Sequence, residues 1–279
     1  MTAGNQAVLM RPPFHLSDLW KAPLHDFPVR DELLFQYLPL AADMSVLEVG
    51  PGAGYTPYRY GRVLRRITLL DIAEANIEQL RRSLGHYPNI QFVAEDVCAP
   101  GLAGRLATTF DAIYGIEVFA CVPDPAACLK NLAAVLNPGG RMLLQWPNYE
   151  RHLRWGPVTS FHSRKEVDGM LRDAGFREWQ LYALKLRPYA DFIYSYFHER
   201  PLRMYRKWAD AKQGATPKTL VYDQTWAFQN RRRLERYRMA IHTYWTVLSG
   251  LMRLGGDAFA RTPLADDILN RNLLLVATK

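Results

Sequence analysis

Three glycines at alternate positions, Gly50, Gly52 and Gly54, directly follow the apolar stretch 45–49 and precede a predicted helix. Because glycine has no Cβ atom, the chain can turn tightly there and a ligand can lie against the backbone. The amino terminus of the following helix presents free N–H groups that can bind a carboxylate or a phosphate. Glu48 lies two residues before the first glycine. This combination predicts a ligand-binding turn at the end of a buried strand.

A second polar feature is Asp71, which ends the next apolar stretch, 67–70, and lies 23 positions after Glu48. In nucleotide-binding α/β folds, an acidic residue about 20 positions after the glycine turn binds the ribose hydroxyls. The glycines and Asp71 together therefore predict a cofactor that contains adenosine.

The spacing of the glycines narrows the choice of cofactor. A dinucleotide-binding turn requires a third glycine three residues after the second, and Tyr55 occupies that position. A nucleoside triphosphate loop requires a lysine followed by serine or threonine, and the stretch contains no such pair. Both cofactor classes are therefore disfavoured.

Three further stretches follow in order: Ala-Glu-Asp-Val at 94–97, an apolar strand at 110–117, and a helix end with Asn-Pro-Gly-Gly at 132–140. Together with 46–54, they resemble the motifs of class I (Rossmann-like) S-adenosylmethionine-dependent methyltransferases. The resemblance covers roughly residues 31–187 and the final strand, and four motifs in order are more specific than a glycine turn alone.

The resemblance implies a part of the cofactor for each matching residue. Gly50, Gly52 and Gly54 contact its methionine part, Glu48 lies near the amino group, and Asp71 binds the ribose.

The remaining matches concern the adenine ring and the methyl group. The resemblance implies that Ile72 covers one face of the adenine, and that Asp96 with Val97 contacts its edge. Gly115 and Ile116 line the methyl-donor end of the site.

The catalytic end is less well defined. Glu117, His152 and His162 are the candidates for a general base, and Tyr149 is a candidate for binding the substrate. Each has a competing structural interpretation, such as capping a turn or lying in solvent. Methyl transfer to a well-aligned nucleophile gains much of its rate from proximity, so a base is not required.

The fold class follows from the alternation of short apolar runs and helical patterns between positions 45 and 187. This pattern predicts an α/β fold with a doubly wound, mostly parallel sheet. The resemblance implies seven strands, with 179–186 as the sixth and 273–276 as an antiparallel last strand. We predict that this last strand pairs beside 141–146, because its four apolar residues require burial on both faces.

The chain is predicted to comprise an N-terminal helical cap (1–44), a cofactor-binding core (45–187), a helical insertion that forms a lid (188–270) and the final strand (271–279). The whole net charge of +8 falls in residues 187–279, which contain 16 basic and 8 acidic residues. Three roles remain open for its arginines: a solvated helix face, recognition of an anionic acceptor by Arg232 and Arg236, and contact with an anionic membrane or RNA.

Composition, cysteine spacing and the residues at 114–117 argue against several classes of protein. Hydrophobic residues make up 49% and charged residues 22% of the chain, as in a globular protein. No signal peptide or membrane span is recognised, and three cysteines without Cys-x-x-Cys spacing predict reduced thiols in a cytoplasmic protein without a metal centre. Tyr-Gly-Ile-Glu at 114–117 replaces the Asn/Asp-Pro-Pro-Tyr/Phe motif of adenine methyltransferases, which disfavours a nucleic acid substrate.

We therefore predict methyl transfer from S-adenosylmethionine to an oxygen or nitrogen of a small or carrier-linked metabolite. Two alternatives remain: an S-adenosylmethionine-binding assembly partner without catalysis, and an aminopropyl transferase of the same fold. The acceptor, the pathway and the oligomeric state are left open.

Overall fold

The computed structural model describes residues 27–52, 54, 57, 60–148, 163–201, 204, 238–263 and 271–279. The described residues fall into two compact units. The first unit, built on a sheet, comprises Tyr37–Lys185 and Arg261–Lys279. The second, helical unit contains the described residues before Tyr37 and those between Leu186 and Ala260.

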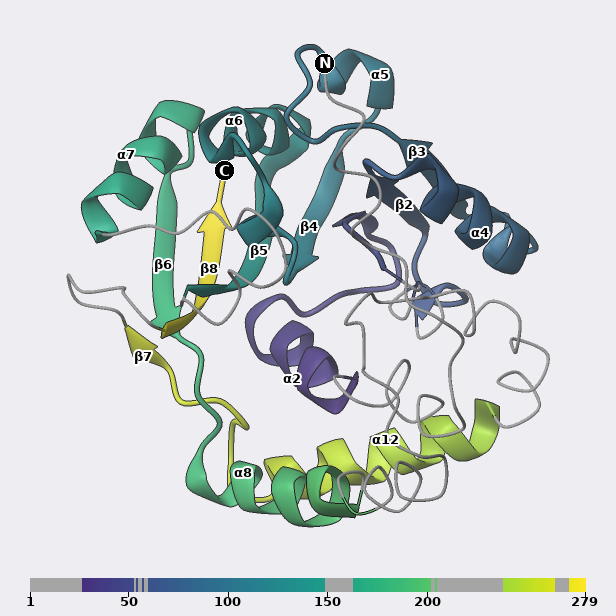
Figure 1. Ribbon diagram of the computed structural model, residues 1–279, viewed down its shortest axis with the longest axis vertical. Coiled ribbons are helices and arrows are strands. Elements are labelled where there is room, and N and C mark those ends of the chain that lie inside the picture. Colours follow the sequence, from purple (N-terminus) through teal and green to yellow (C-terminus); the bar gives the residue numbers. More distant parts are fainter. Residues whose placement is uncertain are drawn as a thin grey trace, which may run out of the picture. The chain divides into compact units, whose positions relative to one another are not determined.

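The sheet has eight strands in the order β3-β2-β1-β4-β5-β8-β6-β7 (Figure 1). Their bounds are β1 Ser45–Val49, β2 Arg66–Asp71, β3 Ile90–Ala94, β4 Phe110–Ile116, β5 Leu136–Asn148, β6 Glu178–Ala183, β7 Thr262–Pro263 and β8 Arg271–Thr278.

Strands β3, β2, β1, β4 and β5 run parallel, and β8 pairs antiparallel with both β5 and β6. Trp146 pairs with Leu273 and Leu143 with Val276, so the predicted position of the last strand is confirmed. The predicted doubly wound sheet is also confirmed. It has one strand more than the seven predicted, because the two-residue strand β7 pairs with Tyr182 and Ala183 of β6.

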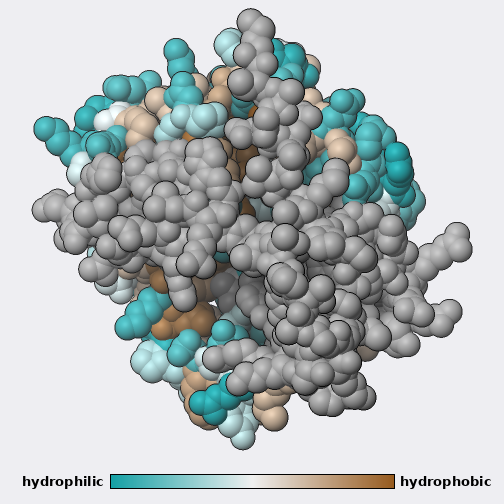
Figure 2. Space-filling model, viewed as in Figure 1, coloured by the Kyte–Doolittle hydropathy of each residue, from teal (hydrophilic) through white to brown (hydrophobic). Residues whose placement is uncertain are grey.

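The sheet is buried by helices on both faces. One hydrophobic cluster joins the sheet to α5 (Leu102–Leu106), α6 (Pro125–Val135) and α7 (Arg164–Ala174). Helix α4 (Glu74–Leu84) buries Ile77, Leu80 and Leu84, and right-handed crossovers place it on the opposite face. The outer surface in the regions of α4 and α7 is mainly hydrophilic (Figure 2), because these helices direct their charged residues outward.

Two of these helices begin at side-chain caps, which are local signals in the sequence. Asp124 accepts a hydrogen bond from the Ala127 N–H at 3.0 Å, and Pro125 occupies the first helical position of α6. Ser163 and Glu166 form a reciprocal capping box at the start of α7. Short 3-10 helix η2 (Phe119–Cys121) lies between β4 and α6.

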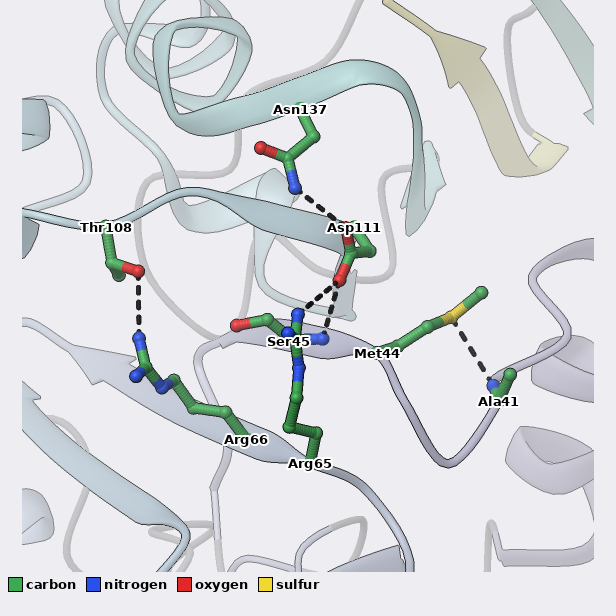
Figure 3. Close-up of polar contacts among 8 residues, drawn as sticks. All are labelled: Ala41, Met44, Ser45, Arg65, Arg66, Thr108, Asp111 and Asn137. Carbon is green, nitrogen blue, oxygen red and sulfur yellow. Dashed lines mark hydrogen bonds and ion pairs between the residues drawn. The ribbon is translucent and has the colours of Figure 1, made fainter.

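The Asp111 side chain links the amino-terminal ends of several parallel strands through hydrogen bonds (Figure 3). One carboxylate oxygen accepts hydrogen bonds from the Ser45 N–H at 2.8 Å and from Arg65 at 3.2 Å. The other accepts one from the Asn137 amide at 2.7 Å. These donors lower the pKa of Asp111, the Ser45 N–H most of all. This cluster joins the starts of β1, β4 and β5 on the edge opposite the glycine turn.

The helical unit joins segments that are far apart in the sequence. Glu32 and Gln36 belong to α2 (Phe27–Tyr37), and Arg253 ends α12 (Arg238–Arg253). Glu32 forms an ion pair with Arg253 at 3.3 Å, and the Gln36 amide both donates to and accepts from the Phe259 backbone at 3.1 and 3.0 Å. Thus α2 and the end of the insertion pack as one body.

The remaining described helices of this unit are α8 (Pro188–Tyr194) and the π-helical turn η4 (Ser195–Glu199). The imidazole of His198 is hydrogen-bonded to the Tyr244 hydroxyl at 2.9 Å and joins η4 to α12. Among the described residues, no helix is both long enough and apolar enough to span a membrane.

We expect Asp111→Ala to lower the free energy of unfolding by about 1–3 kcal/mol, because it leaves the buried Ser45 N–H without its acceptor. A lowered pKa stabilises the fold above the ordinary aspartate pKa, and this contribution is lost as the pH falls through the lowered value. The difference from the parent, measured by urea unfolding, should therefore shrink in acid. Asp43→Ala, at an exposed position near this edge, is the control and should change stability by less than about 0.5 kcal/mol. Equal losses in the two variants would contradict a structural role for Asp111.

Candidate functional site

The glycine turn lies at the carboxyl end of β1, between β2 and β4. The chain leaves β1 toward β2 on one side, whereas β4 returns on the other, so the strand order reverses here. Ligands of open α/β sheets bind at such a switch point. Gly50, Gly52 and Gly54 all have positive φ angles, of 62°, 56° and 76°. Only glycine adopts three such conformations at little cost.

Protein side chains occupy the space that Cβ atoms would fill at two of these glycines. A Cβ on Gly50 would lie 2.4 Å from Cγ2 of Val118, and one on Gly54 would lie 2.7 Å from Leu80 of α4. The sequence predicts ligand approach as the reason for these glycines. Packing from the β4 turn and from α4 is a second reason.

Asp71 ends β2 beside this turn. One oxygen of its carboxylate accepts a hydrogen bond from the Ala73 N–H at 2.9 Å, and the other accepts one from the Asn76 amide at 2.7 Å. Burial raises the pKa of Asp71, and the two hydrogen bonds oppose the rise. Each oxygen keeps further acceptor capacity, so the carboxylate is oriented but still able to bind a ligand hydroxyl.

An exposed apolar residue follows this carboxylate. The side chain of Ile72 is 65% exposed, which is unusual for isoleucine. An exposed isoleucine at this edge of the sheet is an apolar surface of the kind that a flat ring can pack against.

Asp96 and Val97 lie in the loop after β3. The Glu95 N–H donates to the Asp71 carbonyl at 2.9 Å, so this loop runs beside the end of β2. The Asp96 carboxylate accepts a hydrogen bond from the Cys98 N–H at 2.8 Å. The Asn131 amide in α6 donates to the Val97 carbonyl at 2.8 Å. Asn131 therefore fixes the loop, a role with no signal in the sequence because it depends on how α6 packs.

The end of β4 carries Gly115, Ile116 and Glu117. Gly115 is buried, whereas Glu117 is exposed and adopts a left-handed φ of 61°. Non-glycine residues with this conformation are uncommon and often occur at functional sites. The Glu117 N–H donates to both the backbone carbonyl and the side-chain oxygen of Gln145, at 2.8 and 3.1 Å. Gln145 is a further residue that sequence reasoning missed.

Glu48 lies one layer below the turn, in the register of Leu69 and Tyr114 on the neighbouring strands. Its side chain is only 3% exposed. It is therefore an interior acid at the base of the glycine turn.

The sheet register thus assembles the ends of β1, β2, β3 and β4 along one edge of the sheet unit. This edge carries all ten residues predicted to contact the cofactor, together with Glu117. Five predicted residues lie outside the described residues: Tyr149, His152, His162, Arg232 and Arg236. Among the described residues, no group of three His, Cys, Asp or Glu side chains is arranged to hold a metal ion.

A family model described as a methyltransferase domain matches residues 25–204, which is more than half of the chain. The matched region includes every strand of the site edge and ends before the arginine-rich part of the insertion.

Two curated relatives are named ubiquinone biosynthesis O-methyltransferase. The protein from Albidiferax ferrireducens is 31% identical over 121 residues, which cover 42% of this chain and 47% of the relative. The protein from Xanthomonas axonopodis pv. citri is 33% identical over 128 residues, which cover 45% of this chain and 52% of the relative. The chain therefore spans about half the length of these relatives.

Among solved structures, phosphoethanolamine N-methyltransferase 2 from Haemonchus contortus, in complex with S-adenosyl-L-methionine, has a TM-score of 0.54. It is 13% identical, and the match covers 91% of this chain and 52% of that chain. At this identity the similarity concerns the fold alone.

The raised pKa of Asp71 generates a prediction about stability. A carboxyl group whose pKa is raised by folding stabilises the fold while it is protonated, and this contribution is lost as the pH rises through the raised value. We therefore expect the free energy of unfolding of Asp71→Asn, relative to that of the parent, to rise with pH from about pH 4 upward. Urea unfolding at several pH values measures this difference, with the exposed Asp43→Asn as a control that should show no such trend. A difference that falls with rising pH would mean that the hydrogen bonds outweigh burial.

Proposed function

The chain belongs to the methyltransferase-domain family, and from this premise we propose that it transfers a methyl group from S-adenosylmethionine to an oxygen atom of a small metabolite. Membership confirms the predicted resemblance to class I methyltransferases and, with it, the predicted methyl donor. The observation that carries the proposal is the left-handed glycine turn at the strand-order reversal, with the oriented carboxylate of Asp71 beside it.

The chemistry at this edge fits the methyl donor. The glycine turn leaves backbone open to the methionine part, and the interior carboxylate of Glu48 matches the positive charge of its amino group. Asp71 can accept from the ribose hydroxyls, because its hydrogen bonds from Ala73 and Asn76 orient the carboxylate and leave its oxygens further acceptor capacity.

The adenine contacts are assigned on similar grounds. The exposed side chain of Ile72 is placed against one face of the ring. Asp96 and Val97, in a loop fixed by Asn131, are placed at its edge. These assignments use apolar contact and hydrogen-bond acceptors, the two kinds of group that recognise an adenine amino edge and its faces.

The methyl-donor end is assigned to Gly115, Ile116 and Glu117. We propose that Glu117 accepts the proton of the acceptor hydroxyl, because its carboxylate is exposed at the carboxyl end of β4. His152 and His162 remain proposed alternatives for the base, and Tyr149 remains a proposed substrate contact. Holding the hydroxyl oxygen in line at about 3 Å from the methyl carbon supplies the larger part of the acceleration.

The choice of oxygen over nitrogen follows the names of the curated relatives, which are O-methyltransferases. Because the chain spans about half of their length, the acceptor class is part of this proposal. A hydroxyl on a small or carrier-linked metabolite fits it, and an anionic group on that metabolite gives the arginine excess of residues 187–279 a role.

We also propose that residues 188–270 act as a lid above the core of 45–187 and 271–279, with 1–44 as a cap. The support is the point of insertion. Strand β6 runs parallel to β5, so the chain leaves it at the carboxyl edge, and β8 starts from the same edge. Insertions at this edge commonly cover ligand sites in α/β folds.

We expect S-adenosylhomocysteine to bind in the micromolar range and NAD not to bind, because the glycine spacing suits only the former. Calorimetry with both ligands measures this. Asp71→Ala should weaken the binding of S-adenosylhomocysteine by about 1–3 kcal/mol, since charge-assisted hydrogen bonds are lost. Tighter binding of NAD would refute the cofactor assignment, and an unchanged Asp71→Ala would remove Asp71 from the site.

The reaction itself is tested by incubating the protein with S-adenosylmethionine and a panel of hydroxylated and amino metabolites, followed by mass spectrometry. We expect the product mass to increase by one CH2 group on an oxygen. In a parallel incubation with decarboxylated S-adenosylmethionine as the donor, a product that carries an aminopropyl group would support the aminopropyl transferase. Cofactor binding without any product across the panel would favour the non-catalytic alternative.

With the acceptor known, replacing Arg232 and Arg236 by Ala tests the lid. Each lost contact with a desolvated anionic group should cost about 1.5–3 kcal/mol in kcat/KM, through a higher Michaelis constant for the acceptor. The affinity for S-adenosylhomocysteine should not change. Arg172→Ala, at an exposed position in α7, is the matched control. Equal kinetics in the double variant and this control would assign both arginines to a solvated helix face.

A further inference from the structure

Two glycines of the site, on neighbouring strands, face the same side chain. A Cβ on Gly50 would lie 2.4 Å from Cγ2 of Val118, and a Cβ on Gly115 would lie 2.8 Å from its Cγ1. Both distances are far below a normal carbon–carbon contact of about 3.5–4.0 Å. Val118 therefore fills a notch that exists only because both strand ends lack a side chain.

Backbone conformation does not account for the second glycine. Gly50 has a φ of 62°, which by itself favours glycine, but Gly115 is not among the residues with positive φ. What a side chain at position 115 would meet is Val118 and, at 3.3 Å, Leu144 of β5. Close packing against these residues is thus the physical reason for glycine at this position.

Val118 is held in the notch by the residue before it. Glu117 turns the chain through its left-handed conformation, and its N–H is shared between the backbone carbonyl and the side chain of Gln145. Gln145 is buried in β5, where it pairs with Ile116 on one side and Leu274 on the other. On its other flank, the Val118 carbonyl accepts a hydrogen bond from the Cys121 N–H at 2.9 Å.

We propose that Val118 is a positioning residue that locks the glycine turn of β1 to the end of β4, and that Gln145 sets the turn that inserts it. This inference rests on the proposed cofactor site. The lock fixes the position of the glycine turn relative to the proposed base. Gly50 belongs to the turn that contacts the methionine part of the cofactor, and Glu117 is adjacent to Val118 in the chain. In-line transfer depends on the relative placement of these two parts, so one side chain controls an alignment that neither strand controls alone.

The test compares Val118→Ala with Val118→Thr, which keeps two γ atoms and the branched shape. We expect Val118→Ala to raise the dissociation constant of S-adenosylhomocysteine about tenfold, because the loop is no longer pre-organised. Val118→Thr should stay within about twofold of the parent, because both γ positions remain filled and the half-buried site lets the added hydroxyl reach water. Val167→Ala, a buried valine in α7, is the matched control: it should lose stability without weakening binding. Calorimetry is performed where circular dichroism shows each variant to be folded.

A double-mutant cycle tests whether Val118 acts through Gly50. Gly50→Ala places its Cβ against Val118, and removing the γ carbons in Val118→Ala relieves the closest of these contacts. The double variant should therefore lose less than the sum of the two single losses, both in S-adenosylhomocysteine affinity and in urea unfolding. Gln145→Met, which keeps the length but removes the acceptor, should weaken binding in the parent and have a smaller effect in the Val118→Ala background.

Additive losses in the cycle, or parent-like binding by Val118→Ala, would overturn the proposal. If the parent itself fails to bind S-adenosylhomocysteine, the proposed function fails instead. The unfolding cycle needs no cofactor, so it still decides whether the lock between the two strand ends exists.

Discussion

At the carboxyl end of β1 the backbone passes through three left-handed glycines within five residues, and protein atoms close in on this turn from two directions. Val118 approaches from the β4 turn and Leu80 from α4. The positions of both depend on the sheet register, because β4 and β2 pair directly with β1. A tight turn without side chains is needed for a ligand to approach the backbone, and the same absence of side chains lets neighbouring elements brace it. Rigidity of the turn and access to it therefore have the same origin.

Two aspartates at opposite edges of the sheet have pKa values that are shifted in opposite directions. At the amino edge, Asp111 has a lowered pKa because the Ser45 N–H, Asn137 and Arg65 all stabilise its charge. At the carboxyl edge, Asp71 has a raised pKa because burial outweighs the hydrogen bonds that orient it. The negative charge of Asp111 therefore stabilises the fold, whereas the negative charge of Asp71 destabilises it. A carboxylate held in that condition gains most from a ligand that supplies hydroxyl donors.

The fold, and the gathering of the candidate cofactor residues at one edge of the sheet, were largely predictable because their signals are local. Apolar runs marked the strands, caps at Asp124 and Ser163 marked two helices, and Gly50 and Asp71 marked two strand ends. The bracing residues Val118, Gln145 and Asn131 were not predictable. Each acts across a distance set by register or packing, and valine, glutamine and asparagine are ordinary residues in any single sequence. The two-residue strand β7 and the docking of α2 onto Phe259, 223 positions away, were beyond reach for the same reason.

The candidate cofactor residues and the arginine cluster lie in different parts of the chain. The residues assigned to the cofactor lie between Glu48 and Ile116, within the region that matches the family model. That match ends at position 204, whereas the cluster of arginines at 231–238 lies beyond it. A site of this kind keeps one constant ligand and varies the other, so the constant ligand is the one whose contacts a family shares. In the proposed function, the acceptor contacts therefore come from the segment that lies beyond this match. The proposed lock links these two parts, because Val118 packs against Gly50 of the glycine turn and directly follows the proposed base, Glu117, in the chain.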